Sequence, residues 1–246
     1  MASYDWNGKV VLVTGSSSGI GEDCATELVA RGATAVINSV SSVEAGEALA
    51  KRLGKASYFR ADVSAPDEAQ ALIEHCLSTH GRLDGLVNNA GTTAVIPHAD
   101  LDALTPELFR RIFDVNVVGT WNVTHAALPA LREAKGSIVN MGSIAGVRQT
   151  GSSIPYAVSK AALHHLTALL AKVTGPEVRV NAVAPGLIET PWTEDWGTLH
   201  EFVAAAAPLK RTGQPADVAH AVIALLEATY VTGQVHVVDG GLTLVG

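Results

Sequence analysis

Short runs rich in β-branched residues alternate along the chain with longer segments rich in alanine and leucine. The short runs are apolar at nearly every position, which is typical of parallel strands covered by helices on both faces. They predict strands at residues 9–14, 34–38, 56–60, 85–89, 137–141, 178–183 and 234–238. The longer segments predict helices near residues 19–31, 43–53, 65–80, 105–135, 155–174 and 215–229.

This alternation predicts one doubly wound α/β domain over residues 1–246, with a seven-stranded parallel sheet and helices on both faces in a Rossmann-like arrangement. Three of the helices carry start signals, at Ser64, at Thr105 before Pro106, and at Gln214. Pro129, late in the long fourth helix, is expected to kink or end it.

Residues 187–213 interrupt the alternation after the sixth strand and contain Trp192, Trp196 and Phe202. An aromatic insertion beyond the C-terminal end of a strand predicts a lid over a ligand crevice. An ordinary connection whose aromatic side chains pack on the core is the alternative, and the sequence leaves both open.

Hydrophobic residues make up 48% of the 246 residues and charged residues 17%, which excludes a disordered chain. The formal net charge is −7 without any basic block, which argues against a nucleic-acid partner. Apolar runs fall short of the roughly 20 residues that span a bilayer, so no membrane partner is expected. With only Cys24 and Cys76 and no signal-like N-terminal segment, the expected location is the reducing cytoplasm.

A glycine-rich turn, TGSSSGIG, follows the first predicted strand and opens a helix at residues 14–21. Glycines allow a tight turn and a close backbone approach to a pyrophosphate, while the helix N-terminus offers N–H groups to the anion. This context indicates dinucleotide binding. A Walker-type phosphate loop is excluded because no Gly-Lys-Ser/Thr follows.

Tyr156 and Lys160 lie four positions apart in the segment YAVSK. On a helix both side chains leave the same face, one turn apart. A nearby cation stabilises a phenolate, so the pair is suited to a phenol that exchanges a proton near neutral pH.

Four segments in this order, TGxxxGxG, NNAG at 88–91, YAVSK at 156–160 and APG at 184–186, resemble the short-chain dehydrogenase/reductase family, compact oxidoreductase branch. The resemblance runs from about residue 8 to residue 243. It implies a Rossmann-like fold and hydride transfer between a nicotinamide cofactor and a carbonyl–alcohol pair.

The resemblance also implies catalytic roles for four residues. Tyr156 matches the proton donor or acceptor, and Lys160 matches the lysine that lowers the phenol pKa and binds the nicotinamide ribose. Ser143 matches the serine that hydrogen-bonds the substrate oxygen, and Asn116 matches the asparagine that holds a relay water. Taken singly, each of these residues has a structural alternative in packing, capping or solvation.

For the cofactor, the resemblance implies contacts from the glycine turn, from the ends of the second, third and fourth strands, from the YAVSK pair and from the segment after APG. These residues are Gly15, Ser17, Ser18, Gly19, Ile20, Gly21, Ser39, Asp62, Val63, Asn89, Ala90, Gly91, Tyr156, Lys160, Pro185, Gly186, Ile188 and Thr190. As structural alternatives, Asp62 could cap the following helix, and the APG turn could simply end a strand.

The choice between NAD and NADP is made at the end of the second strand, where an acidic residue binds the ribose 2′-OH and a basic residue accepts the 2′-phosphate. Ser39 and Val40 occupy these positions, so neither charge is present. The missing acid removes repulsion of a 2′-phosphate, and nearby serines could donate hydrogen bonds. The sequence therefore favours NADP over NAD.

The predicted substrate pocket is mostly apolar, which suits a ketone or secondary alcohol with an apolar body. Its walls are predicted to be Ile144, Ala145, Gln149, Ile154, Leu187, Trp192 and Trp196. The alternative is a 3-oxoacyl-carrier-protein reductase of fatty-acid synthesis, whose acidic carrier needs a basic docking patch. Only scattered groups such as Arg110, Arg111, Lys210 and Arg211 are available.

A non-enzymatic dinucleotide sensor is an alternative from another class, and the intact Ser143, Tyr156 and Lys160 argue against it. The adjacent His164 and His165 point about 100° apart on a helix, so no metal site is predicted. The helices at 105–135 and 155–174 are apolar over a wide arc, which indicates a second packing partner. Together with the family resemblance, this predicts a homotetramer.

Overall fold

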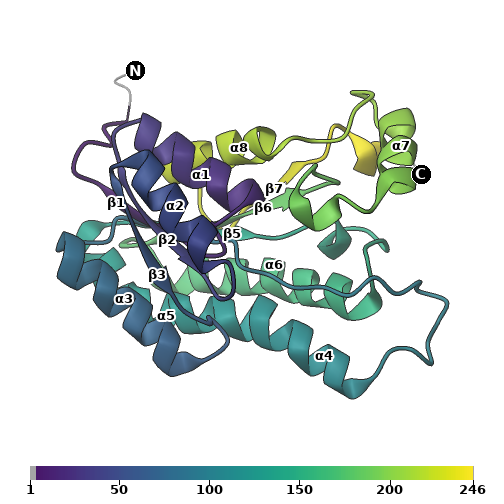
Figure 1. The fold of residues 1–246 in the computed structure, drawn as a ribbon, viewed down its shortest axis with the longest axis horizontal. Helices are drawn as coiled ribbons and strands as arrows, with labels where there is room; N and C mark the ends of the chain where they lie inside the picture. Colours follow the sequence, from purple (N-terminus) through teal and green to yellow (C-terminus); the bar gives the residue numbers. More distant parts are fainter. Residues whose placement is uncertain (1–3, 246) are drawn as a thin grey trace.

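The computed structural model describes residues 4–245, which form a seven-stranded, fully parallel sheet between two layers of helices (Figure 1). The strand order β3-β2-β1-β4-β5-β6-β7 reverses between β1 and β4. The strands are β1 (Val10–Val13), β2 (Thr34–Ser39), β3 (Ala56–Arg60), β4 (Gly85–Asn88), β5 (Ser137–Met141), β6 (Arg179–Pro185) and β7 (Val235–Val238). The predicted fold class and all seven predicted strands are confirmed to within two residues at each end.

Each face of the sheet is covered by its own set of helices, and a core lies under each set. The helices are α1 (Gly19–Ala30), α2 (Val43–Leu53), α3 (Pro66–His80), α4 (Pro106–Phe113), α5 (Thr120–Ala134), α6 (Ile154–Thr174), α7 (Gly197–Ala206) and α8 (Pro215–Glu227). Leu72 of α3 and Leu131 of α5 belong to the core on one face, and Leu28 of α1 and Val222 of α8 to the core on the other. Burial on both faces explains why the strands are apolar throughout.

The predicted helix at 105–135 is interrupted in the structure, and the position of the interruption differs from the prediction. A π-helical segment, η1 (Asp114–Gly119), separates α4 from α5. Pro129 lies inside α5, which continues to Ala134 and ends where Lys135 turns left-handed. Of the two outcomes expected at Pro129, a kink or an end of the helix, the end does not occur there. Single π-helical turns occur frequently at functional sites, and this one contains Asn116.

Two of the three predicted helix starts are confirmed. The Thr105 hydroxyl accepts a hydrogen bond from the Leu108 N–H, and Gln214 caps α8. Ser64 does not cap α3, because its hydroxyl donates to the Asp62 carboxylate and Ala65 is the residue that precedes the helix.

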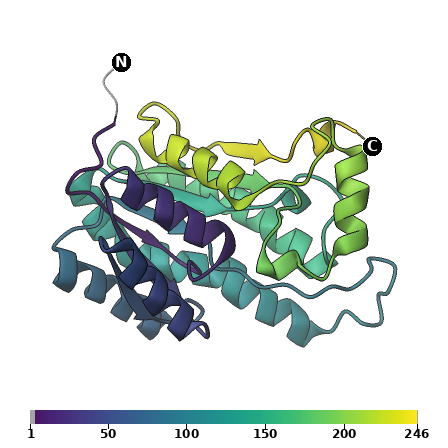
Figure 2. The same ribbon diagram turned by 45° about the horizontal axis from the view of Figure 1, so that its top comes forward.

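Residues 187–213 form two short pieces, η3 (Pro191–Thr193) and α7, at the end of the molecule towards which the strands point (Figure 2). Trp192 and Phe202 are exposed, so these aromatic side chains do not pack into the core as the connection alternative required. Two further short helical turns, η2 (Ile144–Gly146) and η4 (Leu242–Leu244), follow β5 and β7. Within residues 4–245, no helix combines the length and apolarity that crossing a membrane requires.

Candidate active site

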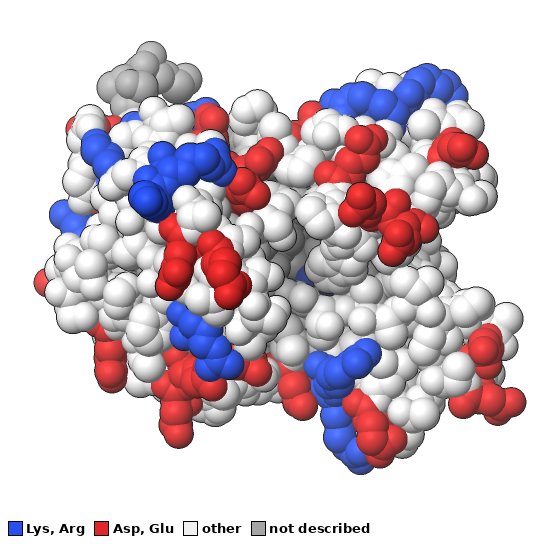
Figure 3. All heavy atoms as spheres, in the orientation of Figure 1, with Lys and Arg blue, Asp and Glu red and all other residues white. Residues whose placement is uncertain are grey.

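A cavity of about 900 Å³ opens at the carboxyl ends of the strands, next to the reversal between β1 and β4. The space-filling view shows this hollow near the centre of one face (Figure 3). Its walls come from the glycine turn, from the loops after β4 and β5, from the start of α6 and from residues 185–203. In open parallel sheets, ligands bind at this topological switch point.

Tyr156 and Lys160 lie in the first two turns of α6 and line the cavity together. The helix begins at Ser153, whose hydroxyl accepts a hydrogen bond from the Tyr156 N–H at 3.4 Å. The Lys160 ammonium nitrogen lies 5.6 Å from the centre of the Tyr156 ring and donates to the Met141 carbonyl at 2.7 Å. Lys160 is only 3% exposed.

The electrostatics of this pair differ from the expectation. Burial lowers the pKa of Lys160 from 10.5 to about 8. Burial also raises the pKa of Tyr156, and a hydrogen bond from the Ser143 hydroxyl offsets part of that rise. The expectation that Lys160 lowers the pKa of the phenol is therefore not met in the free protein, where desolvation is the largest influence. The phenol is protonated at neutral pH.

Ser143 and Asn116 approach the same wall from other elements. Ser143 follows β5 and begins η2, where its side-chain oxygen accepts a hydrogen bond from the Ala145 N–H at 3.1 Å. The Asn116 amide joins two segments: it accepts from the Thr92 N–H at 2.8 Å and donates to the Thr92 carbonyl and to the Ser159 hydroxyl, both at 3.0 Å. Asn116 thus ties the loop after β4 to α6, directly beside Tyr156.

The glycine turn packs against the end of β4. Gly15 has a φ of +59°, and a β-carbon there would lie 2.8 Å from the Ala90 α-carbon, so a side chain would fill the crevice. The Thr14 hydroxyl oxygen accepts hydrogen bonds from the N–H groups of Asn89 and Ala90 at 3.1 and 3.0 Å. Gly19 then opens α1, with its N-terminus towards the cavity. These residues fit a dinucleotide pyrophosphate.

Most of the predicted cofactor residues line this cavity. They are Gly15, Ser18, Gly19, Ile20, Asn89, Ala90, Gly91, Tyr156, Lys160, Pro185, Gly186, Ile188 and Thr190. Ser17, Gly21, Ser39, Asp62 and Val63 do not. Gly21 is buried beneath the turn, where a β-carbon would lie 2.6 Å from the Gly15 carbonyl oxygen.

Three of the residues outside the cavity have other contacts. The Ser39 hydroxyl donates to the Ser42 carbonyl at 3.1 Å and lies 2.9 Å from the Tyr58 hydroxyl, so it does not point to a ligand. The Asp62 carboxylate accepts hydrogen bonds from the Ser64 N–H and hydroxyl, which supports the turn before α3. Val63 is buried.

A basic residue that the sequence did not predict, Arg60, ends β3 and lies beside the end of β2. Strand pairing sets Arg60 opposite Ser39, and the Arg60 guanidinium donates to the Val40 carbonyl at 3.3 Å. Arg60 also forms a salt bridge with Glu68 at 2.8 Å and remains half exposed. Arg60 follows Val40 by 20 residues in the sequence, so no local pattern relates the two residues. Only the parallel pairing of β2 with β3 brings Arg60 and Val40 together.

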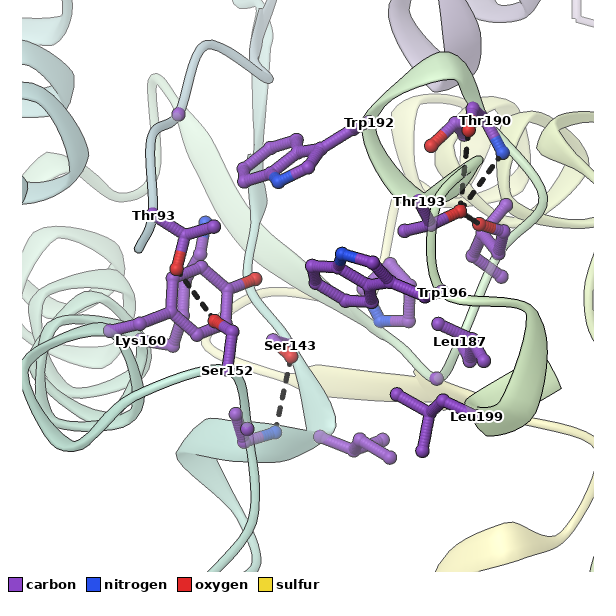
Figure 4. Close-up of a pocket in the computed structure, with 18 of the residues that line it drawn as sticks. Thr93, Ser143, Ser152, Lys160, Leu187, Thr190, Trp192, Thr193, Trp196 and Leu199 are labelled. Atoms are coloured by element: carbon purple, nitrogen blue, oxygen red, sulfur yellow. Dashed lines mark hydrogen bonds between the residues drawn. The ribbon is translucent and has the colours of Figure 1, made fainter. Parts of the chain in front are cut away.

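The predicted substrate residues Ile144, Ala145, Gln149, Leu187, Trp192 and Trp196 line the cavity, whereas Ile154 does not, because it begins α6 outside the wall. Trp192 and Trp196 point from the segment after β6 into the space in front of Ser143 (Figure 4). Trp192 meets the Tyr156 ring edge-on, with 6.4 Å between the ring centres.

The opposite wall was not predicted. Thr93, Val95, Ile96 and His98 belong to the irregular loop after β4, which offers no periodic pattern to read. The Thr93 and Ser152 hydroxyls lie 2.6 Å apart and join this loop to the segment before α6 (Figure 4). Across residues 4–245, no three His, Cys, Asp or Glu side chains form a group that could hold a metal ion.

Comparison with known proteins identifies the family of the chain. A family model described as "Enoyl-(Acyl carrier protein) reductase" matches residues 15–243. A protein of Streptomyces violaceoruber named "Granaticin polyketide synthase putative ketoacyl reductase 2" is 56% identical over 239 residues, which is 96% of each chain. The 3-oxoacyl-[acyl-carrier-protein] reductase FabG of Thermotoga maritima is 37% identical, over 96% of this chain and 98% of that protein.

Solved structures show the same architecture. A short-chain type dehydrogenase/reductase from Mycobacterium ulcerans superposes with a TM-score of 0.92 at 33% identity, covering 98% of this chain and 92% of that one. Levodione reductase superposes with a TM-score of 0.90 at 31% identity, covering 97% and 99%. The chain belongs to the short-chain dehydrogenase/reductase family. It is an oxidoreductase of the kind that uses NAD(P) and acts on CH–OH and keto groups.

Proposed function

We propose that this enzyme interconverts an apolar ketone and a secondary alcohol, with Tyr156 as the general acid or base. The observation that carries the proposal is the meeting of Ser143, Tyr156 and Lys160 on one wall of a cavity whose other end is the glycine turn. A nicotinamide cofactor bound along this cavity supplies or accepts the hydride. The protein positions the ketone and moves the proton.

The protonation state of Tyr156 favours the reductive direction. Because burial raises its pKa, the phenol carries a proton at neutral pH and can donate it to the oxygen of a ketone. The Ser143 hydroxyl lies beside the phenol and can hold the same oxygen. Lys160, whose pKa is about 8, has its ammonium nitrogen 5.6 Å from the centre of the phenol ring. Asn116 links the loop after β4 to Ser159 of α6, and we place a relay water beside this link.

For the substrate, we propose a ketoacyl group of the polyketide type, carried as a thioester. The support is the 56% identity to the granaticin ketoacyl reductase over almost the whole of both chains, and the apolar wall formed by Leu187, Trp192 and Trp196. A 3-oxoacyl-carrier-protein reductase of fatty-acid synthesis is the second candidate, supported by the 37% identity to FabG. Arg110 and Arg111 form a small basic group in the last turn of α4.

For the cofactor, we propose a preference for NADP that depends on Arg60 rather than on the serines. The Arg60 guanidinium lies against the end of β2, where a 2′-phosphate is recognised, while the Ser39 hydroxyl is turned inward. Arg60→Gln should raise the KM for NADPH about 10-fold and leave that for NADH unchanged, since one charged hydrogen bond is lost. Arg52→Gln, which removes another exposed arginine, is the control. Equal effects on both nucleotides would remove Arg60 from this role.

The test of the function is turnover of NADPH and NADH with an apolar ketone, a bulky 3-oxoacyl thioester, an acetoacetyl thioester and the matching alcohols. Tyr156→Phe should lower kcat on the order of 10²–10⁴-fold, while Tyr230→Phe, at a fully exposed position, should leave it unchanged. Preference for the bulky 3-oxoacyl thioester over the acetoacetyl thioester supports the polyketide type, and the reverse preference supports the fatty-acid type. Tight nucleotide binding without any turnover would instead indicate a sensor.

We also propose a homotetramer. The outer faces of α5 and α6 expose apolar side chains, including Trp121, Val158, Leu169 and Val173. Exposed apolar faces of this kind are typical of subunit contacts. A monomeric mass in light scattering at micromolar concentration would refute this assembly.

A further inference from the structure

The loop that carries Ser143 is folded around an imidazole. His164 lies one turn after Lys160 on α6, and a β-carbon at Gly142 would lie 2.2 Å from its Nε2 atom. A β-carbon at Gly146 would lie 2.8 Å from its Cε1 atom. At Gly142 the imidazole occupies the space that a side chain would need. At Gly146 it shares that space with the backbone of α6, since a β-carbon there would also lie 2.7 Å from the Lys160 carbonyl carbon.

The two nitrogen atoms of this imidazole face the two ends of the η2 turn. Nε2 accepts a hydrogen bond from the Ser143 N–H at 3.5 Å, and the ring interacts with the backbone of Gly146 at the other end. An acceptor at Nε2 requires the neutral ring to carry its proton on Nδ1, which is then a donor. Burial and the nearby Lys160 lower the pKa of His164, which keeps the ring neutral.

The Ser143 N–H depends on this contact. Among residues 4–245, no backbone or side-chain oxygen accepts a hydrogen bond from it. The Ser143 side-chain oxygen is held separately, by the Ala145 N–H at 3.1 Å. Loss of the imidazole would leave the N–H without its acceptor and open a gap beneath the turn. The serine hydroxyl would then lose its fixed distance from Tyr156.

We propose that His164 is a positioning residue that fixes the Ser143 hydroxyl for the reaction, acting from behind the turn. His164 does not line the cavity, so it acts through Ser143 and touches neither cofactor nor substrate. The inference rests on the proposed catalytic role of Ser143. It assigns a role to one of two adjacent histidines, because His165 is exposed and points about 100° away from His164 around α6.

The kinetic test compares His164→Leu and His164→Gln with His220→Leu, at an exposed position of α8, as the control, using whichever ketone the wild-type enzyme reduces. A Gln amide can place an acceptor where Nε2 lies, and Leu cannot. His164→Leu should lower kcat about 10–100-fold, because a displacement of about 1 Å at a reacting group costs this much. The dissociation constant for NADPH should stay unchanged, and His164→Gln should recover most of kcat. Equal kcat values for His164→Leu and His220→Leu would overturn the proposal, as would equal losses in the His164→Leu and His164→Gln variants.

A second measurement does not depend on activity. In ¹⁵N–¹H spectra of the ¹⁵N-histidine-labelled protein, one of the 9 histidines is assigned to His164 by its disappearance in His164→Gln. The expected state is a neutral ring with the proton on Nδ1. A proton on Nε2 would exclude acceptance from the Ser143 N–H and overturn the proposal. If Tyr156→Phe retained full activity, the proposed function would fail. The position of the proton on the His164 ring would still show whether Nε2 accepts the hydrogen bond from the Ser143 N–H.

Discussion

Replacing Lys160 by methionine should change the pH dependence of stability in a direction that the structure fixes. Methionine keeps much of the length of the side chain and removes the charge. The wild-type ammonium group is 3% exposed and donates one hydrogen bond, to the Met141 carbonyl at 2.7 Å. A cation buried with one neutral partner is destabilising relative to its neutral form.

The size of the effect follows from the pKa of Lys160, which burial lowers from 10.5 to about 8. Between these pH values the unfolded chain binds more protons than the folded protein. The lysine therefore destabilises the fold most below pH 8, and stability rises as the pH increases through this interval. The whole interval corresponds to about 3 kcal/mol. About 2 kcal/mol of it falls between roughly pH 7 and pH 9.5.

The assay is urea denaturation of the wild type and Lys160→Met at fixed protein concentration, at several pH values in this range. The other titrating groups contribute equally to the pH dependence of both proteins, so their contributions cancel in the difference between the two free energies of unfolding. Tyr156 stays protonated throughout, because its pKa is raised. The lost hydrogen bond to Met141 adds an offset that does not vary with pH. The wild type should gain about 2 kcal/mol relative to the variant as the pH rises.

A difference that stays constant across the range would refute the reasoning, because it would mean that the ammonium group is as well hydrated as in the unfolded chain. A difference that falls with rising pH would mean that the folded protein stabilises the charged form.

Two further predictions concern packing around the site. Gly146→Ala should lower the free energy of unfolding by about 1–3 kcal/mol, because its β-carbon would lie 2.7 Å from the Lys160 carbonyl carbon. In the control, Gly197→Ala, the added β-carbon meets no atom within 4 Å, so this variant should be neutral. Equal melting temperatures of the two variants would contradict this prediction. Asn116→Leu should lower the free energy of unfolding by about 2–4 kcal/mol in urea denaturation, because the N–H and the carbonyl of Thr92 both lose their partner in a partly buried place. A loss below about 1 kcal/mol would show that water replaces the amide.

Local patterns were enough to predict the sheet, because strands covered on both faces are apolar throughout and glycine turns have few alternatives. The same reason explains why three parts of the site could be identified, since each lies within one continuous segment. They are the glycine turn after β1, the Tyr156–Lys160 pair, and Trp192 and Trp196. The resemblance to the family then supplied Ser143 and Asn116, which are unremarkable residues in a single sequence.

The tertiary structure decided the contacts between segments that are distant along the chain. Pairing of β2 with β3 brings Arg60 to the Val40 carbonyl, and the crossing of α6 beneath η2 brings His164 to the Ser143 N–H. The raised pKa of Tyr156 is likewise set by burial rather than by its neighbour four residues away. A side chain's neighbours in sequence fix its secondary structure, but its solvation and its hydrogen-bond partners come from whichever strands and helices pack against it.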